Sequence, residues 1–184
     1  MKELVKQFLE KLGEDPNREG LLKTPERVEE AFGYLTEGYS MNIEEIVNGA
    51  LYHEKCDEII MVKDIQFYSL CEHHMLPIFG KCYVGYIPRD VIIGLSKIPR
   101  IVDMFARRLQ LQERMTLQIA ECLQEVLNPH GIAVVTEAYH LCMMMRGVEQ
   151  HNAHTVASTM LGVFRSSPRT RAEFLQLMER RIAD

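Results

Sequence analysis

The chain has 184 residues, 47% of them hydrophobic, and a formal net charge of -5 at pH 7. This size and composition allow a buried core without disulfide bonds, and no run of lysine or arginine is long enough to predict a nucleic-acid surface. Residues 1–10 mix charged and apolar side chains at helical spacing, so they form neither a signal peptide nor a membrane span. We therefore expect a soluble, cytoplasmic protein whose 5 cysteines stay reduced.

The first segment, residues 1–50, is predicted to form short helices. Thr24 is a suitable N-cap for a helix that has Pro25 in its first turn. Asn42 and Glu45 have the spacing of a capping box for another short helix. These signals predict an N-terminal helical region ahead of the main domain.

The second segment, residues 51–184, alternates pairs of predicted strands with helices. A first pair of strands is followed by two helices, of which one begins at Ser96 and the other ends near Asn128. A second pair of strands precedes a last helix that includes Phe174 and Ile182. The predicted strands cover residues 59–70, 81–87, 132–145 and 154–165. This order predicts an α+β domain in which an antiparallel sheet carries helices on one face.

Cys71, His74 and Cys142 are candidate metal ligands. The first two are three positions apart, and the set provides two thiolates and one imidazole, which leaves a fourth zinc position for water. An open position is typical of a catalytic zinc site and not of a structural one. His73 stands beside His74, so spacing alone leaves open which imidazole binds the metal. The other cysteines are interpreted as packing residues.

Strand periodicity predicts which side chains accompany Cys142. Alternate residues of an extended segment share a face, so His140, Cys142 and Arg146 would project to one side if the strand continued to Arg146. The odd positions, including Val135 and Tyr139, would then face the core. The sequence thus predicts that a metal ligand, a titratable imidazole and a phosphate-binding guanidinium share one face of this strand.

A second group of polar residues lies at predicted helix starts. Ser96, Lys97 and Arg100 would surround a helix N-terminus, whose free N–H groups and cations favour a polyphosphate. The alternative is an ordinary solvated helix face. Gln112 and Glu113 begin the next helix, where polar first-turn residues are common without any further role.

Five segments, in order along the chain, resemble the signature blocks of one enzyme family. They are Ser69-Leu70-Cys71-Glu72-His73-His74, Gly94-Leu95-Ser96-Lys97-Ile98-Pro99-Arg100, Gln112-Glu113-Arg114, His140-Leu141-Cys142-Met143-Met144-Met145-Arg146-Gly147-Val148 and Ser158-Thr159-Met160-Leu161-Gly162-Val163-Phe164. The chain resembles GTP cyclohydrolase I from about Pro16 to the last helix. The resemblance implies a zinc enzyme of the tunnelling fold (T-fold), with residues 51–184 as its catalytic domain. It would convert GTP and water to 7,8-dihydroneopterin triphosphate and formate, the entry step to folate or tetrahydrobiopterin-type pterins.

The resemblance also implies a role for each candidate residue. It assigns zinc to Cys71, His74 and Cys142 and acid/base catalysis to His73 and His140. The triphosphate would be held by Ser96, Lys97, Arg100 and Arg146, and guanine by Glu113, with Gln112 lining the same pocket. The family implies a homodecamer whose active sites lie between neighbouring subunits.

Three alternatives are weighed against this interpretation. A zinc-dependent base deaminase would need a His-x-Glu and a Pro-Cys-x-x-Cys block, which the sequence does not contain. A non-enzymatic zinc module would need a fourth ligand, which could be His73, Glu72 or a residue of a neighbouring chain. A T-fold relative that acts on another pterin or a deazapurine would not need the cations at Lys97, Arg100 and Arg146.

Overall fold

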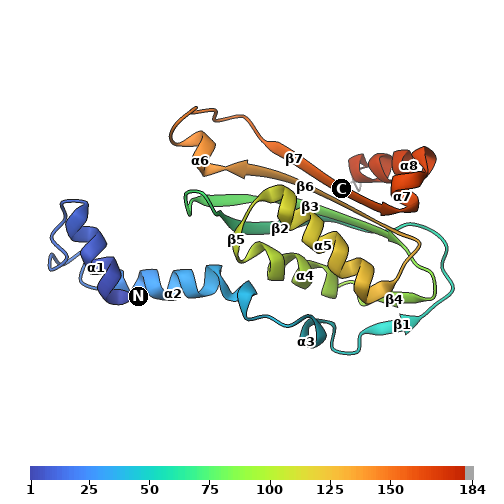
Figure 1. Cartoon of the computed structure of the whole chain (residues 1–184), viewed down its shortest axis with the longest axis horizontal. Helices are drawn as coiled ribbons and strands as arrows, with labels where there is room; N and C mark the ends of the chain where they lie inside the picture. Colours follow the sequence, from blue (N-terminus) through green and yellow to red (C-terminus); the bar gives the residue numbers. More distant parts are fainter. Residues whose placement is uncertain (181–184) are drawn as a thin grey trace.

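The computed structural model describes residues 1–180, and a five-stranded sheet forms its centre (Figure 1). The strands lie in the order β5-β2-β3-β6-β7, and neighbours are antiparallel except β5 and β2, which are parallel. Their bounds are β2 Ile60–Cys71, β3 Pro77–Ile87, β5 Leu109–Gln110, β6 Gly131–His140 and β7 Thr155–Gly162. A separate ribbon pairs β1 Leu51–His53 with β4 Val91–Ile93. The predicted α+β architecture is confirmed, although β5 and this ribbon were not predicted.

Helices α4 Lys97–Ala106 and α5 Gln112–Leu127 cover one face of the sheet (Figure 1). Apolar residues recur on each helix at spacings of three and four, so one stripe of each helix can be buried. The stripes pack on alternate residues of the strands and form the main core. Its fully buried members include Ile98, Ile101, Val102, Ile119, Leu123, Val84, Ile132 and Val134.

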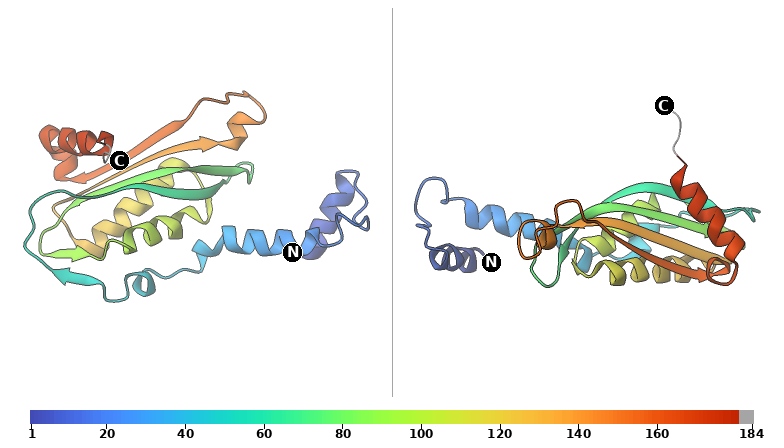
Figure 2. Two further views of the ribbon diagram at one scale, coloured as in Figure 1. Left: turned by 180° about the vertical axis from the view of Figure 1, so that it is seen from behind. Right: turned by 90° about the horizontal axis from the view of Figure 1, so that it is seen from above.

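The last helices cover part of the opposite face of the sheet. Figure 2 shows α8 Pro168–Glu179 on the side away from α4 and α5, and α7 Val163–Ser166 leads into it. The rings of Phe164 and Phe174 meet edge to face at 5.6 Å between centroids. Gly85 is required beneath Phe174, because a Cβ at that position would lie 2.7 Å from the ring. A second, smaller core therefore holds α8 against the strands.

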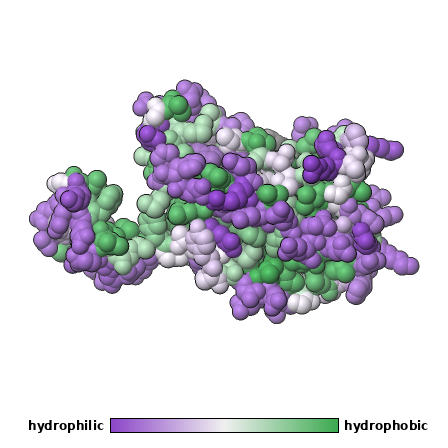
Figure 3. All heavy atoms as spheres, viewed as in Figure 1, coloured by the Kyte–Doolittle hydropathy of each residue, from purple (hydrophilic) through white to green (hydrophobic). Residues whose placement is uncertain are grey.

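The N-terminal region is helical, as predicted, and projects from the sheet. It consists of α1 Lys2–Lys11, α2 Thr24–Leu35, the 3-10 turn η1 Glu37–Tyr39 and α3 Ile43–Val47. Figures 1 and 2 show α1 and α2 as an arm beyond the end of the sheet. The arm exposes Leu4, Phe8 and Leu12, and green apolar atoms are visible on it in Figure 3. The division into residues 1–50 and 51–184 stays a prediction. Within residues 1–180, no helix has both the length and the apolar character needed to cross a membrane.

The helix starts differ in detail from the predicted caps. Helix α2 already includes Thr24, with Lys23 in the cap position and no side-chain cap bond. Asn42 does cap α3, but its side chain accepts from the N–H of Glu44 at 2.8 Å. Ser96 precedes α4 without making a side-chain cap bond. Of the last predicted helix, Phe174 is confirmed, and Ile182 lies outside the described residues.

The third predicted strand is shorter than expected. Strand β6 ends at His140, and residues Leu141–Met144 form the helical turn α6. The prediction was wrong here because a short apolar run fits a buried strand and a helical turn equally well. The predicted core face was wrong in part: Val135 is buried in the smaller core, but Tyr139 is exposed and the even position Val134 faces the main core. Both faces of the sheet are covered around Val134 and Val135, so apolar residues there do not alternate with polar ones.

Candidate metal and substrate site

The turn between β2 and β3 places Cys71 and His74 side by side. The N–H of Met75 bonds the Cys71 carbonyl at 2.7 Å, and the Cys71 N–H bonds the Leu76 carbonyl at 2.8 Å. Met75 has a positive φ of 53°, which closes the turn. As a result the Cys71 Sγ and the His74 Nδ1 lie 3.9 Å apart.

Helix α6 brings the third candidate ligand to the same place. One ligand atom from each of Cys71, His74 and Cys142 lies within 4.8 Å of the others. The sequence predicted that His140 and Cys142 share one face of a continued strand, but a helical turn begins directly after His140 and carries Cys142. Burial, with the neighbouring Cys71 thiol, raises the pKa of Cys142. A soft divalent cation fits this donor set, because it would stabilise both thiolates, including that of Cys142, which burial disfavours.

Two exposed residues stand beside this cluster. The Nη1 of Arg146 lies 3.1 Å from the Nε2 of His74. Because a guanidinium only donates, His74 must accept this bond through an unprotonated Nε2. His73 is exposed, with its ring 6.2 Å from that of His74 and nearly perpendicular to it. Arg146 and His73 therefore both lie next to the predicted metal ligands.

His140 lies at the end of β6, half-buried beside the start of α5. Its Nε2 is 2.9 Å from the Oε1 of Gln112, which is 4% exposed. Burial lowers the pKa of His140, while the nearby carboxylate of Glu113 raises it by less. His140 is thus favoured as a neutral imidazole, in a position to exchange a proton with a bound molecule.

The predicted triphosphate cradle is not beside this cluster within one chain. Ser96 and Lys97 are at the β4 end of α4, whereas the other end of α4 leads into β5 next to Cys71 (Figure 1). A helix of 10 residues spans about 15 Å. Arg100 lines a separate hollow with Glu37 and Asp103. The chain therefore divides the predicted residues into a metal-side group and a distant cationic group.

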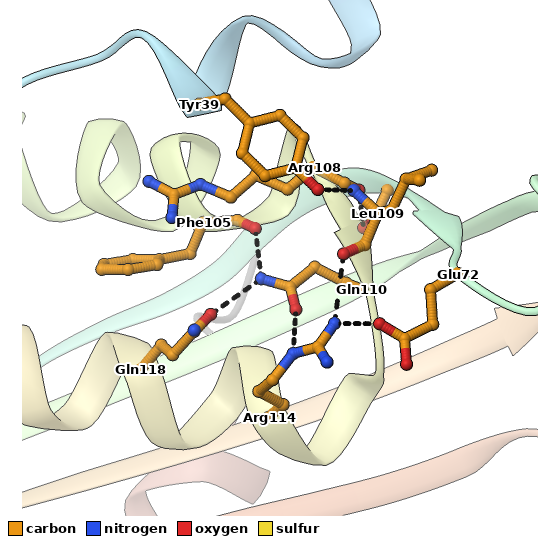
Figure 4. A network of polar contacts seen from close by, with 9 residues as sticks. Tyr39, Glu72, Phe105, Arg108, Leu109, Gln110, Arg114 and Gln118 are labelled. Carbon is orange, nitrogen blue, oxygen red and sulfur yellow. Dashed lines mark hydrogen bonds and ion pairs between the residues drawn. The ribbon is translucent and has the colours of Figure 1, made fainter.

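A polar network contacts the turn that carries Cys71 and His74, which we call the metal turn. The sequence did not predict this network. Figure 4 shows Arg114 of α5 in an ion pair with Glu72, the residue after Cys71. Arg114 Nε also donates to the side-chain oxygen of Gln110 at 3.1 Å, and the Glu72 N–H bonds the Gln110 carbonyl at 3.1 Å. The i,i+4 spacing of Gln110 and Arg114 was a possible signal. Its link to Glu72 depends on β5 pairing with β2, which no local pattern predicted.

A model of the GTP cyclohydrolase I family matches residues 1–179 of the chain. The chain belongs to the GTP cyclohydrolase I family. A GTP cyclohydrolase 1 from Leptospira biflexa is 56% identical over 178 residues, which cover 97% of both chains. A GTP cyclohydrolase 1 1 from Pseudomonas aeruginosa is 58% identical over 175 residues, which cover 95% of this chain and 94% of the relative. The recognition from five sequence blocks is confirmed.

A solved structure supports the fold. The chain is similar to an archaeosine synthase QueF-Like in the apo form, with a TM-score of 0.50 and 18% identity. The match covers 59% of this chain and 97% of that chain, and at this identity it shows the fold alone. The predicted T-fold is confirmed.

Membership of the GTP cyclohydrolase I family establishes the reaction. The enzyme hydrolyses GTP, opening the guanine ring at C8, and forms 7,8-dihydroneopterin triphosphate and formate for pterin biosynthesis. The family is metal-dependent, and the cluster of Cys71, His74 and Cys142 is the candidate metal site.

Proposed function

We propose that the metal is zinc and that Cys71, His74 and Cys142 hold it. The observation that carries the proposal is the convergence of two sulfurs and one imidazole nitrogen within 4.8 Å. This is a zinc donor set, and three protein ligands leave a position for the reaction. Zinc held there would act as a Lewis acid toward the water that adds to C8 of guanine.

His140 and His73 are proposed as the acid/base pair. The lowered pKa of His140 suits a group that takes a proton near neutral pH, when water adds at C8 or N7 changes its protonation. His73 is exposed beside His74, where it can protonate the ribose ring oxygen as the sugar opens. The two imidazoles thus serve different steps of one reaction.

Guanine recognition is assigned to Glu113, next to His140. Its carboxylate can accept two N–H bonds from the guanine edge, which adenine does not present in the same places. Gln112 is proposed to line the same pocket. The amide of Gln112 is already hydrogen-bonded to the protein, so a direct bond from its side chain to guanine would displace one of these partners.

Arg146 is proposed to bind the triphosphate after leaving His74. If His74 binds zinc through Nδ1, the nitrogen that faces Cys71, its proton resides on Nε2. Nε2 can then no longer accept from Arg146, so the guanidinium becomes available to the phosphates.

The remaining triphosphate ligands are proposed to come from a neighbouring chain. Ser96 and Lys97 lie a helix length from the metal cluster of their own chain, and Arg100 lines a separate hollow, which supports a site completed by another subunit. A homodecamer with active sites between subunits would meet this requirement. We place the enzyme in the cytoplasm, where the thiols of Cys71 and Cys142 stay reduced.

The test is incubation of the zinc-loaded protein with GTP, with formate and 7,8-dihydroneopterin triphosphate measured in parallel. We expect equal amounts of both products, their loss on chelation and their return when zinc is added. ATP serves as the control nucleotide and should release no formate.

The other outcomes contradict specific parts of the proposal. Ammonia in place of formate would indicate a deaminase. Formate without the pterin would separate ring opening from rearrangement and remove His73 from its assigned step. A folded, zinc-loaded protein that leaves GTP unchanged would favour a non-enzymatic zinc module or a T-fold enzyme for another pterin or deazapurine.

A further inference from the structure

Gln112 connects His140 to a buried hydrogen-bond network that includes Thr136 and Thr155. Its side-chain nitrogen donates to the Thr136 carbonyl at 3.0 Å, to the Thr136 hydroxyl at 3.1 Å and to the Thr155 carbonyl at 3.1 Å. Its Oε1 faces His140 Nε2 at 2.9 Å and accepts a bond from the Thr155 hydroxyl. Every polar atom of the buried amide is therefore in use.

These partners determine which way the amide points. Backbone carbonyls only accept hydrogen bonds, so the side of Gln112 that faces the carbonyls of Thr136 and Thr155 must be the NH2 group. A reversed amide would place Oε1 against two other acceptors in a buried site, which is costly. The oxygen of Gln112 is thus directed at His140 by groups other than His140.

The orientation of the amide decides where His140 carries its proton. An amide oxygen can only accept, so the bond from His140 requires an N–H on Nε2. A neutral imidazole has one N–H, and the nitrogen that remains with a lone pair is then Nδ1.

We propose that Gln112 is a positioning residue that holds neutral His140 as its Nε2–H tautomer, so that Nδ1 is the nitrogen that exchanges protons with the substrate. This inference rests on the proposed acid/base role of His140. It gives Gln112 a function through His140, distinct from contact with guanine.

The network around Gln112 is built to resist rotation of its side chain. The hydroxyl of Thr116 donates to the main-chain carbonyl of Gln112 at 2.7 Å and lies 2.8 Å from the hydroxyl of Thr136. Thr116 and Thr136 are both fully buried. Thr136 of β6 and Thr155 of β7 therefore hold the amide from two strands, and Thr116 of α5 contacts the Thr136 hydroxyl behind it, as a fixed tautomer requires.

The direct test is ¹⁵N NMR of zinc-loaded protein labelled at histidine, at a pH where the ring is neutral. The signals of His140 are identified by their absence in His140→Gln. We expect a protonated, pyrrole-type Nε2 and a pyridine-type Nδ1. The reverse pattern, with the proton on Nδ1, would overturn the inference. Because the measurement is made on the wild-type protein, no substitution disturbs the packing around His140.

Gln112→Met tests the effect on the reaction. It keeps the volume of the side chain but removes the acceptor for His140, so we expect kcat to fall about 10- to 100-fold, part of what acid/base catalysis supplies. The dissociation constant for GTP, measured on chelated protein, should change less than about twofold if Gln112 acts through His140. Gln124→Met is the matched control, because it removes a partly buried glutamine near the other end of the same helix, away from His140 and from the network of Gln110, Arg114 and Glu72.

The outcomes separate this inference from the proposed function. If the wild-type protein releases no formate from GTP, the proposed function fails whatever the tautomer. If His140→Gln retains full activity, the acid/base role of His140 fails. If His140 is needed but Gln112→Met keeps the wild-type kcat, or loses no more than Gln124→Met, the positioning role alone is wrong.

Discussion

At the scale of single residues, the candidate metal site depends on the ligand atom that each side chain provides. Cys142 approaches Cys71 and His74 because a helical turn begins directly after His140. A thiolate is a much stronger zinc ligand than a hydroxyl. Replacing one ligand atom therefore tests the metal site without changing the fold.

Cys142→Ser is expected to lower zinc content from one per chain to near zero and to abolish formate release. The change is nearly isosteric and Cys142 is only partly buried, so the circular dichroism spectrum should not change. Zinc is measured by chelator competition and atomic emission. Cys56→Ser is the control, since Cys56 lies outside the cluster. Full zinc content in Cys142→Ser would remove Cys142 from the site.

At the scale of elements, short β5 joins the metal turn to the start of α5. Its pairing with β2 places Gln110 beside Cys71, and Arg114 then reaches Glu72 in the metal turn. The ion pair is partly exposed, so its own contribution to stability is small. Its effect should be on the geometry of the turn that carries Cys71 and His74.

Arg114→Met is expected to weaken zinc binding by about tenfold, the lower range for residues that orient metal ligands. Competition with a chromogenic chelator measures the affinity, and the free energy of unfolding of the metal-free protein should change little. Arg18→Met is the matched control, because Arg18 pairs with Glu14 on the exposed arm far from the cluster. Unchanged zinc affinity in Arg114→Met would show that the turn holds its shape without the ion pair.

At the scale of the whole molecule, two cores stabilise the chain, and the length of α4 separates the two groups of predicted site residues. The main core fixes α4 and α5 on the sheet, and the smaller core holds α8 on the other face. The cationic end of α4 is left far from the metal cluster of the same chain. Substitutions in the smaller core therefore test stability, and substitutions in the two groups of site residues test whether neighbouring chains share a site.

Phe174→Ala is expected to lower the free energy of unfolding by about 3–5 kcal/mol, because it leaves a cavity against Phe164 and Gly85. Urea denaturation of the two proteins side by side gives the difference. Leu175→Ala, on the neighbouring and 38% exposed position of the same helix, should cost clearly less. Equal losses would mean that the smaller core does not hold α8 in place.

Mixing two defective variants tests whether sites are shared between chains. Lys97→Ala damages the cationic half and Cys142→Ser the metal half, so each alone should be nearly inactive at low GTP. If each site combines halves of two neighbouring chains, equal mixing by denaturation and refolding should restore about a quarter of wild-type activity by random pairing. Mixtures that remain as inactive as the separate variants would place both halves in one chain.

The sequence by itself determined the family, the α+β class and the chemical types of the site, because these depend on residue identity and on periodicities within short segments. Spacing placed an imidazole next to Cys71 in one tight turn but left His73 and His74 open, and the family resemblance selected His74. The tertiary structure alone decided that β6 stops at His140, that Gln112 contacts His140 and that Arg114 reaches Glu72. These contacts join residues 28 and 42 positions apart in the chain, and only the packing of α5 on the sheet brings them together. The separation of Ser96 and the Lys97 cation from the metal cluster has the same origin, because helix length and direction act at a scale that no local pattern records.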